Sequence, residues 1–316
     1  MNIVYVKKKR RLYDYIFLTG TQSSGEFGNN YISSVAEPYP YLDNNSWKQI
    51  ETNYYYSTLA IDNNSNLWGW GANTHGILQN EDLNILEQYP VLIDSGENWS
   101  SISMGENHCM AIKSNGTLWG IGSNTKAQLG IYENELQKTP LDINVSGIAQ
   151  IVSSDNGSSF FIKTDGTLWA WGYNVNAQLG LGDTTQRTSP VQVGTDTNWA
   201  SVSGGTLYTL AVKTNGTLWA WGNNSYGNLG LGDTTQRTSP VQVGTDTNWE
   251  SVSCGNYHTL AFKTNGTLWA WGSNSSGQLG LGDKTQRTSP VQVGTDTNWK
   301  FFTVTNSGSH VIKNTY

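Results

Sequence analysis

The chain repeats itself at a period of fifty residues. Residues 179–199 read LGLGDTTQRTSPVQVGTDTNW, residues 229–249 repeat that string letter for letter, and residues 279–299 differ from it only at Lys284. Self-similarity at a period of about 20–50 residues is typical of propellers and solenoids. Because one such unit cannot bury its apolar face alone, the period predicts a scaffold of packed repeats.

Each repeat reads as several short antiparallel strands. Ala200–Ser203 forms a first strand, Tyr208–Lys213 alternates apolar and polar residues as a strand does, and Thr217–Gly222 returns from it. A last strand, Val241–Val243, follows Pro240 at its start. No segment predicts a helix of any length, so the fold class is all-β.

The turn and the tryptophans of the returning strand are the clearest local signals. Asn215-Gly216 favours a two-residue hairpin with a type I′ turn. Trp219 and Trp221 lie on one face of the returning strand, with Leu218 and Ala220 on the other. Both faces are apolar, so we expect each sheet to be buried between two similar sheets, with the indoles in the core.

Counting the glycine that ends this strand gives six repeats. It falls at Gly20, Gly71, Gly122, Gly172, Gly222 and Gly272, with spacings of 51, 51, 50, 50 and 50 residues. Trp299–Lys313 matches Trp249–Lys263 and then stops, and Tyr15–Gly20 supplies the strand that is missing there. We therefore predict a closed β-propeller of six blades, with the two chain ends completing one blade and removing open edges; seven blades or an incomplete ring are the alternatives.

The N-terminus carries two features outside this pattern, so we divide the chain into residues 1–11 and a single propeller domain, 12–316. Ile3–Val6 is one strand more than closure needs; it pairs within the ring, displaces the C-terminal strand, or adds to the sheet of a partner. A basic run follows, read as a solvated hairpin turn or as a polyanion contact. It consists of Lys7, Lys8, Lys9, Arg10 and Arg11.

Composition excludes several classes of protein. The net charge of -6 argues against a general nucleic-acid surface, which needs positive charge to neutralise phosphate. Cys109 and Cys254 have unrelated positions and are expected as buried thiols. No stretch is apolar enough for a signal peptide or a membrane span, so we expect a soluble protein of a virion or the cytoplasm.

No catalytic or metal-binding constellation stands out. His108, His258 and His310 are assigned to one repeat position, where Tyr208 and Ser158 also occur, and a position so varied serves packing rather than catalysis. The recurring pair Asp233 and Arg237 is interpreted as loop bracing. We predict no enzyme activity, no cofactor and no metal.

The segment SVSCGNYHTLAFKTNGTLWAWGSNSSGQLGLGD (Ser251–Asp283) resembles the repeats of the regulator of chromosome condensation (RCC1-like) family. The resemblance covers nearly the whole chain and implies a β-propeller, usually of seven blades. Family members that catalyse guanine-nucleotide exchange carry an inserted β-wedge, for which the spacing here leaves no room. Ultraviolet-B photoreceptors carry Gly-Trp-Arg-His-Thr where this chain has Asn256 and Tyr257. The regular LWAWG arrays look most like bacterial and bacteriophage members.

Comparison among the repeats locates the candidate contact residues. Residues that differ follow each Trp-Gly or precede each hairpin, and loops on one rim of a rigid scaffold are natural contact sites. We predict a non-enzymatic protein-binding or structural propeller, as a component of a virion or a cell surface. The alternatives are a regulatory nucleotide-exchange or polyanion-binding propeller and a glycan-binding propeller. The candidate partner-contact residues are Tyr173, Asn174, Asn176, Asn223, Asn224, Tyr226, Asn256, Tyr257, Ser273 and Asn274.

Overall fold

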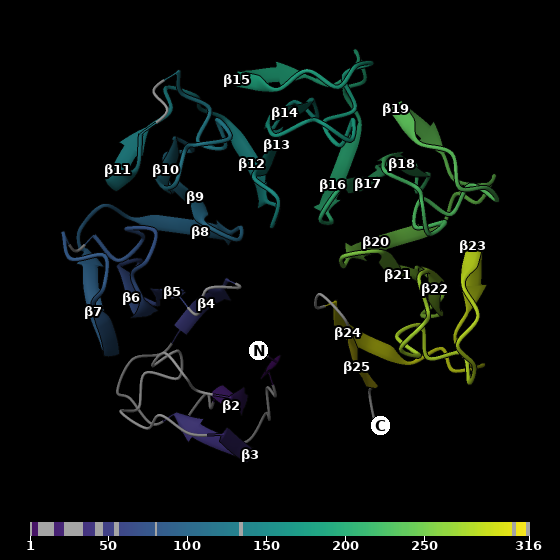
Figure 1. Cartoon of the computed structure of the whole chain (residues 1–316), viewed down its shortest axis with the longest axis horizontal. Helices are drawn as coiled ribbons and strands as arrows, with labels where there is room; N and C mark the ends of the chain where they lie inside the picture. Colours follow the sequence, from purple (N-terminus) through teal and green to yellow (C-terminus); the bar gives the residue numbers. More distant parts are fainter. Residues whose placement is uncertain are drawn as a thin grey trace. The chain divides into compact units, whose positions relative to one another are not determined.

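A computed structural model describes residues 2–5, 16–21, 34–41, 47–53, 57–79, 81–132, 135–304 and 308–313, and all of its regular elements are β-strands (Figure 1). The chain divides into two compact units, residues 1–125 with 133–153 and residues 126–132 with 154–316. The expected class, all-β, is confirmed. The basic run at residues 7–11 lies outside the described residues.

The first unit contains β1 to β12. Its strands are β1 (Asn2–Tyr5), β2 (Ile16–Thr21), β3 (Ser34–Tyr41), β4 (Trp47–Thr52), β5 (Ser57–Asp62), β6 (Leu67–Ala72), β7 (Leu86–Asp94), β8 (Trp99–Met104), β9 (His108–Lys113), β10 (Leu118–Gly122), β11 (Gln137–Asp142) and β12 (Ile148–Ser153). β4-β5-β6-β7 and β8-β9-β10-β11 are four-stranded sheets in chain order, with each neighbouring pair antiparallel.

The second unit contains β13 to β25. Its strands are β13 (Ser158–Lys163), β14 (Leu168–Gly172), β15 (Arg187–Gln192), β16 (Trp199–Gly204), β17 (Tyr208–Lys213), β18 (Leu218–Gly222), β19 (Arg237–Gln242), β20 (Trp249–Cys254), β21 (His258–Lys263), β22 (Leu268–Gly272), β23 (Arg287–Gln292), β24 (Trp299–Val304) and β25 (Ser309–Lys313). β16-β17-β18-β19 and β20-β21-β22-β23 repeat the same sheet, and β20 packs on β16 and β17.

The hairpin turn differs from the one predicted. Gly216 has a φ of 75°, whereas Asn215 is not among the residues with positive φ, and a type I′ turn needs positive φ at both. The Gly216 N–H donates to the Lys213 carbonyl and the Lys213 N–H to the Thr217 carbonyl. The loop is therefore a three-residue type I turn followed by a glycine bulge.

Side chains lock this turn to the tryptophan of the next strand. The Asn215 Oδ1 accepts from the backbone N–H and the hydroxyl of Thr217, and the Thr217 Oγ1 accepts from the Trp219 indole at 2.9 Å. This chain of hydrogen bonds, which we call the relay, satisfies the polar atoms of a partly buried hairpin and fixes the orientation of the Trp219 indole. It recurs with Asn115, Asp165 and Asn265 in the turn position.

The second tryptophan joins consecutive repeats. Trp271 is fully buried in a core cluster with Tyr208, Leu210 and Leu218 of the preceding sheet. Its indole N–H donates to the carbonyl of Asn228 at 2.9 Å, in the loop before β19. Trp221 makes the same bond to the Gln178 carbonyl. The predicted core role is confirmed for these second indoles, because each is buried between its own sheet and a loop of the preceding repeat. The first indole of the strand, Trp219, is only partly buried.

A glycine in that loop makes room for the indole. A methyl group added to Gly230, whose φ is 73°, would lie 2.8 Å from the Trp271 Nε1. Gly180 stands in the same relation to Trp221. These glycines therefore supply both a left-handed backbone and a close approach.

The last strand of each sheet begins earlier than predicted and carries a proline inside it. β19 spans Arg237–Gln242, so Pro240 is its fourth residue rather than the one before it. Proline removes a ladder donor, and natural sheets place it on edge strands to prevent pairing with other chains. Six of the seven prolines follow this fifty-residue spacing: Pro40, Pro90, Pro140, Pro190, Pro240 and Pro290.

The chain ends correct one prediction. β1 pairs antiparallel with β2, with Ile3 opposite Leu18, and β2 pairs on its other edge with β3. Both edges of β2 are thus occupied within its own unit, so the expected pairing of Tyr15–Gly20 with the C-terminal strand is absent. β24 and β25 form a two-stranded sheet. The extra N-terminal strand takes the place that was assigned to the C-terminal one.

Candidate protein-binding edge

The residues that differ between repeats gather in the loops at one end of the strands of each sheet. We call this end of the sheets the variable edge. Tyr208, at the start of β17, lies opposite Gly222, at the end of β18, so the loop before β17 and the segment after β18 lie side by side. The Asn223 N–H donates to the Leu207 carbonyl at 2.9 Å and fixes the two segments together. The Asn-Gly turns lie at the opposite end of the same strands.

Two tyrosines from consecutive repeats meet on this edge. The rings of Tyr226, after β18, and Tyr257, before β21, have centroids 4.7 Å apart at an angle of 44°. Tyr226 is 41% exposed. Beside them, the Thr206 hydroxyl donates to the Asn256 Oδ1. A stiff, partly exposed aromatic pair of this kind offers contact area at low entropic cost.

A cation lies on the same edge two repeats earlier. The Lys126 ammonium lies 4.9 Å from the ring centroid of Tyr173 and donates to the side chain and carbonyl of Asn156. Val175, two residues after Tyr173 in the chain, is 58% exposed. Lys126 was missed in the sequence, although it occupies the repeat position of Asn176 and Tyr226, where the comparison among repeats points.

Four candidate contact residues are buried instead. Ser273 and three asparagines are each at most 9% exposed. Asn224 shows their role: its Oδ1 accepts from the Leu229 N–H, and its Nδ2 donates to Asp233. These side chains hold the loop and are not contact residues. The three asparagines are Asn174, Asn224 and Asn274.

The loop bracing predicted for the recurring charges is confirmed. The Arg237 guanidinium donates to the Asp233 carboxylate at 2.6 Å and to the Thr235 carbonyl. This hydrogen bond from arginine, together with the Thr235 N–H, lowers the pKa of Asp233. Asp183 with Arg187 and Asp283 with Arg287 repeat the pair.

The histidine position is structural, with one correction. His258 is fully buried, its Nε2 lies 3.1 Å from the Ser309 Oγ, and burial lowers its pKa to about 4. His310 does not share this position. In the strand register it pairs with Thr303, as Leu260 pairs with Ser253, so it corresponds to Leu260 and not to His258. Both cysteines are free thiols, and burial raises the pKa of each.

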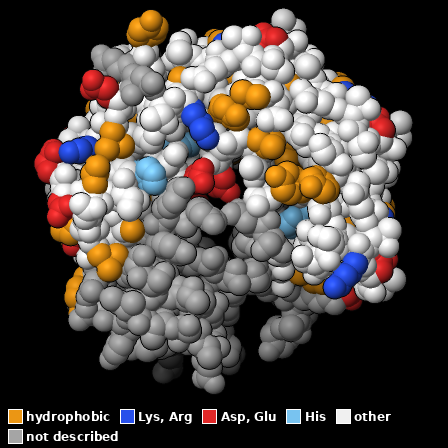
Figure 2. All heavy atoms as spheres, in the orientation of Figure 1, with side chains coloured by type: hydrophobic (Ala, Val, Ile, Leu, Met, Phe, Trp, Pro, Cys, Tyr) orange, Lys and Arg blue, Asp and Glu red, His pale blue; other side chains and the backbone are white. Residues whose placement is uncertain are grey.

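The space-filling view agrees with an adaptable polar surface. On the face drawn in Figure 2, most described atoms are backbone or uncharged polar side chains, and the hydrophobic side chains form separate groups among them. None of the described residues forms a helix long and apolar enough to cross a bilayer.

Residues 10–312 match the profile of the RCC1-like domain. The chain belongs to the RCC1-like domain family. Among curated relatives, this RCC1-like chain is 30% identical over 112 residues to Protein pim1 of Schizosaccharomyces pombe, covering 34% of the chain and 19% of that protein. It is 39% identical over 76 residues to a Protein RCC2 homolog of Xenopus laevis, covering 23% of the chain and 15% of that protein. The match thus spans a fifth or less of these relatives.

Solved structures show the same fold for the RCC1-like chain. Human WBSCR16 has a TM-score of 0.80 at 18% identity, over 94% of this chain and 80% of that one. Yeast RCC1 (Prp20), crystallised with Kap60, has a TM-score of 0.64 at 19% identity, over 95% and 89%. The fold is therefore an all-β, propeller-like array of repeated four-stranded sheets. The expected virion role finds no support among these proteins.

Proposed function

We propose that this chain is a non-enzymatic, protein-binding propeller whose variable edge contacts the partner. The observation that carries the proposal is that shared residues of the near-identical repeats are buried, whereas residues that differ between them are exposed. Shared residues such as Asn224, Trp221 and Gly230 are buried in the scaffold. Residues that differ, such as Tyr226 and Val175, are exposed on one edge.

The chemistry of that edge suits a protein surface. Tyr226 and Tyr257 form an aromatic pair, Lys126 adds one cation over Tyr173, and asparagine and threonine supply donors and acceptors. Aromatic anchors surrounded by adaptable polar groups are typical of protein-recognition surfaces. A yeast protein of similar fold has been crystallised with Kap60, which supports a protein partner by analogy only.

Photo-crosslinking in an extract of the source organism tests this proposal. A benzophenone side chain at position 226 or 257 is expected to capture one and the same protein. The matched control places the benzophenone at Thr214, which is exposed at the opposite end of the sheet. Equal capture from all three positions, or none from 226 and 257, contradicts the proposal.

We infer further that the repeats close into a ring of seven blades. β1 already occupies the edge of β2 that a ring of six blades would need for β25, and β24 with β25 would form the seventh blade. Cysteine at Leu18 combined with cysteine at Ile3 or at His310 distinguishes the two arrangements. The pair that forms a disulfide without added strain identifies the strand beside β2.

Nucleotide exchange is the second candidate, and it is carried by family membership. A similar structure, Prp20p of Saccharomyces cerevisiae (TM-score 0.63, 19% identity, 95% of this chain and 91% of that chain), is described with binding to Gsp1p and histones. At this identity the likeness shows the fold alone. Release of labelled GDP from small GTPases of the source organism would support exchange, and an unchanged release rate would remove it.

A further inference from the structure

The repeat departs from its regular form between β11 and β12. In the three repeats that follow, the partner of the first indole is glutamine, as Gln242 is of Trp219. Trp68 of β6 pairs instead with Leu92, and Trp119 pairs with Asp142. The connection to the next strand is also one residue shorter, since six positions separate Asp142 from Ile148 and seven separate Gln242 from Trp249.

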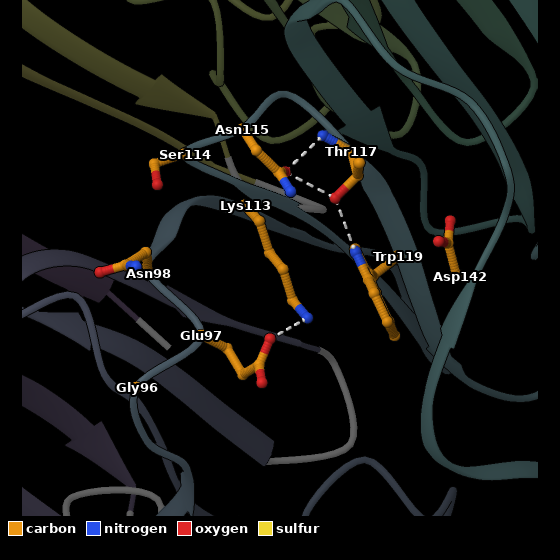
Figure 3. A pocket seen from close by; sticks show the side chains of 9 residues that line it. All are labelled: Gly96, Glu97, Asn98, Lys113, Ser114, Asn115, Thr117, Trp119 and Asp142. Carbon is orange, nitrogen blue, oxygen red and sulfur yellow. Dashed lines mark hydrogen bonds and ion pairs between the residues drawn. The ribbon is translucent and has the colours of Figure 1, made fainter.

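The shorter connection leaves space beside the hairpin turn. A methyl group added to Gly216 would overlap the Thr247 carbonyl of the next connection, whereas one on Gly116 would lie 3.4 Å from the backbone of Gly147. A pocket of about 450 Å³ lies here, lined by the turn, the loop before β8 and β11 (Figure 3). Its volume falls in the usual range for small-molecule sites.

The lining is polar and carries both signs of charge. Lys113 pairs with Glu97, and its ammonium lies 3.6 Å from the ring centroid of Trp119. Asp142 has no ion pair among the described residues, and one of its oxygens accepts from the Asn144 N–H. In Figure 3 the side chains of Lys113, Trp119 and Asp142 border the same space.

These charges select the class of ligand. The two carboxylates disfavour an anion. The Lys113 ammonium and the Asn115 amide supply donors beside these carboxylates, so both donors and acceptors line the pocket. A neutral ligand rich in hydroxyl groups matches this lining, because hydroxyls donate to Glu97 and Asp142 and accept from Lys113 and Asn115. We propose that this pocket binds a carbohydrate of one or two sugar units.

Saturation-transfer NMR with maltose, lactose, cellobiose and N,N′-diacetylchitobiose tests the proposal on the full chain. At least one of these disaccharides is expected to bind, and Asp142→Gln to weaken its affinity about tenfold by removing a charge-assisted hydrogen bond. Gln is the residue that the three following repeats carry, so the variant is compatible with the scaffold. The control Gln242→Asp leaves binding unchanged.

A second variant tests the shortened connection itself. Replacing residues 143–147 with residues 193–198 restores the regular length while keeping Asp142, and it is expected to abolish binding, with the circular dichroism spectrum retained. Failure of all four disaccharides to bind overturns the proposal, as does binding that both variants leave intact. Binding of L-arginine amide in the pocket, in place of the sugars, would assign it to a cationic ligand instead.

Discussion

Gly230→Ala tests how the repeats are joined. Gly230 and Gly280 occupy the same repeat position with φ of 73° and 67°, so alanine at either costs about 1–2 kcal/mol of left-handed strain. They differ in their neighbours. The added methyl lies 2.8 Å from the Trp271 indole at Gly230, but 3.7 Å from a Val293 methyl at Gly280.

The indole must therefore move in the Gly230 variant alone. Displacing it weakens the hydrogen bond from Trp271 to the Asn228 carbonyl, worth about 1 kcal/mol, and overpacks a buried cluster, which costs about 1–3 kcal/mol. We expect Gly230→Ala to lower the free energy of unfolding by about 2–4 kcal/mol more than Gly280→Ala does. Urea unfolding followed by circular dichroism measures the difference. Equal losses in the two variants would refute the conclusion that the Trp271 indole, packed against Gly230, joins consecutive repeats.

Three further predictions concern pH, the turn and the sheet edges. Burial lowers the pKa of His258 from 6.5 to about 4, so the stability that neutral His258 contributes is fully present above pH 6.5 and is lost as the pH falls towards 4. Urea unfolding should show a decrease of about 3 kcal/mol in the free energy of unfolding over this range, and His258→Tyr should not show it. Parallel pH profiles of the two proteins would contradict this. Asn215→Asp should change the free energy of unfolding by less than about 0.5 kcal/mol, since Asp165 already makes the same hydrogen bonds in its own repeat. Asn215→Ala should lower it by about 1–2 kcal/mol. Equal losses in urea unfolding would contradict the stabilising role of these hydrogen bonds. Pro240→Val should promote self-association in sedimentation velocity relative to the same-strand control Thr238→Val, and a monomer at every concentration would count against edge protection.

The strands were the most predictable part of the structure. Tyr208–Lys213 was predicted with the bounds that β17 has, because the Asn215-Gly216 turn marks where it ends. The turn was not, because Asn-Gly serves both two- and three-residue loops, and the choice depends on hydrogen bonds from Thr217 to the Asn215 side chain.

The candidate edge was located in outline but not residue by residue. Asn224 was selected as a polar loop residue, yet asparagine occupies this position in five repeats, and that identity marks a scaffold role. Tyr226 and Tyr257 were selected correctly as partly exposed, but their contact joins two repeats and follows only from packing. The pocket beside Trp119 depends on a missing residue, which no motif signals.

Hydrogen exchange on the complex with the crosslinked partner tests the central claim most directly. Slower exchange at residues 223–227 and 255–257, with no change at 214–217, is the result we predict. Protection of the Asn-Gly turns with the tyrosine loops unaffected would contradict it.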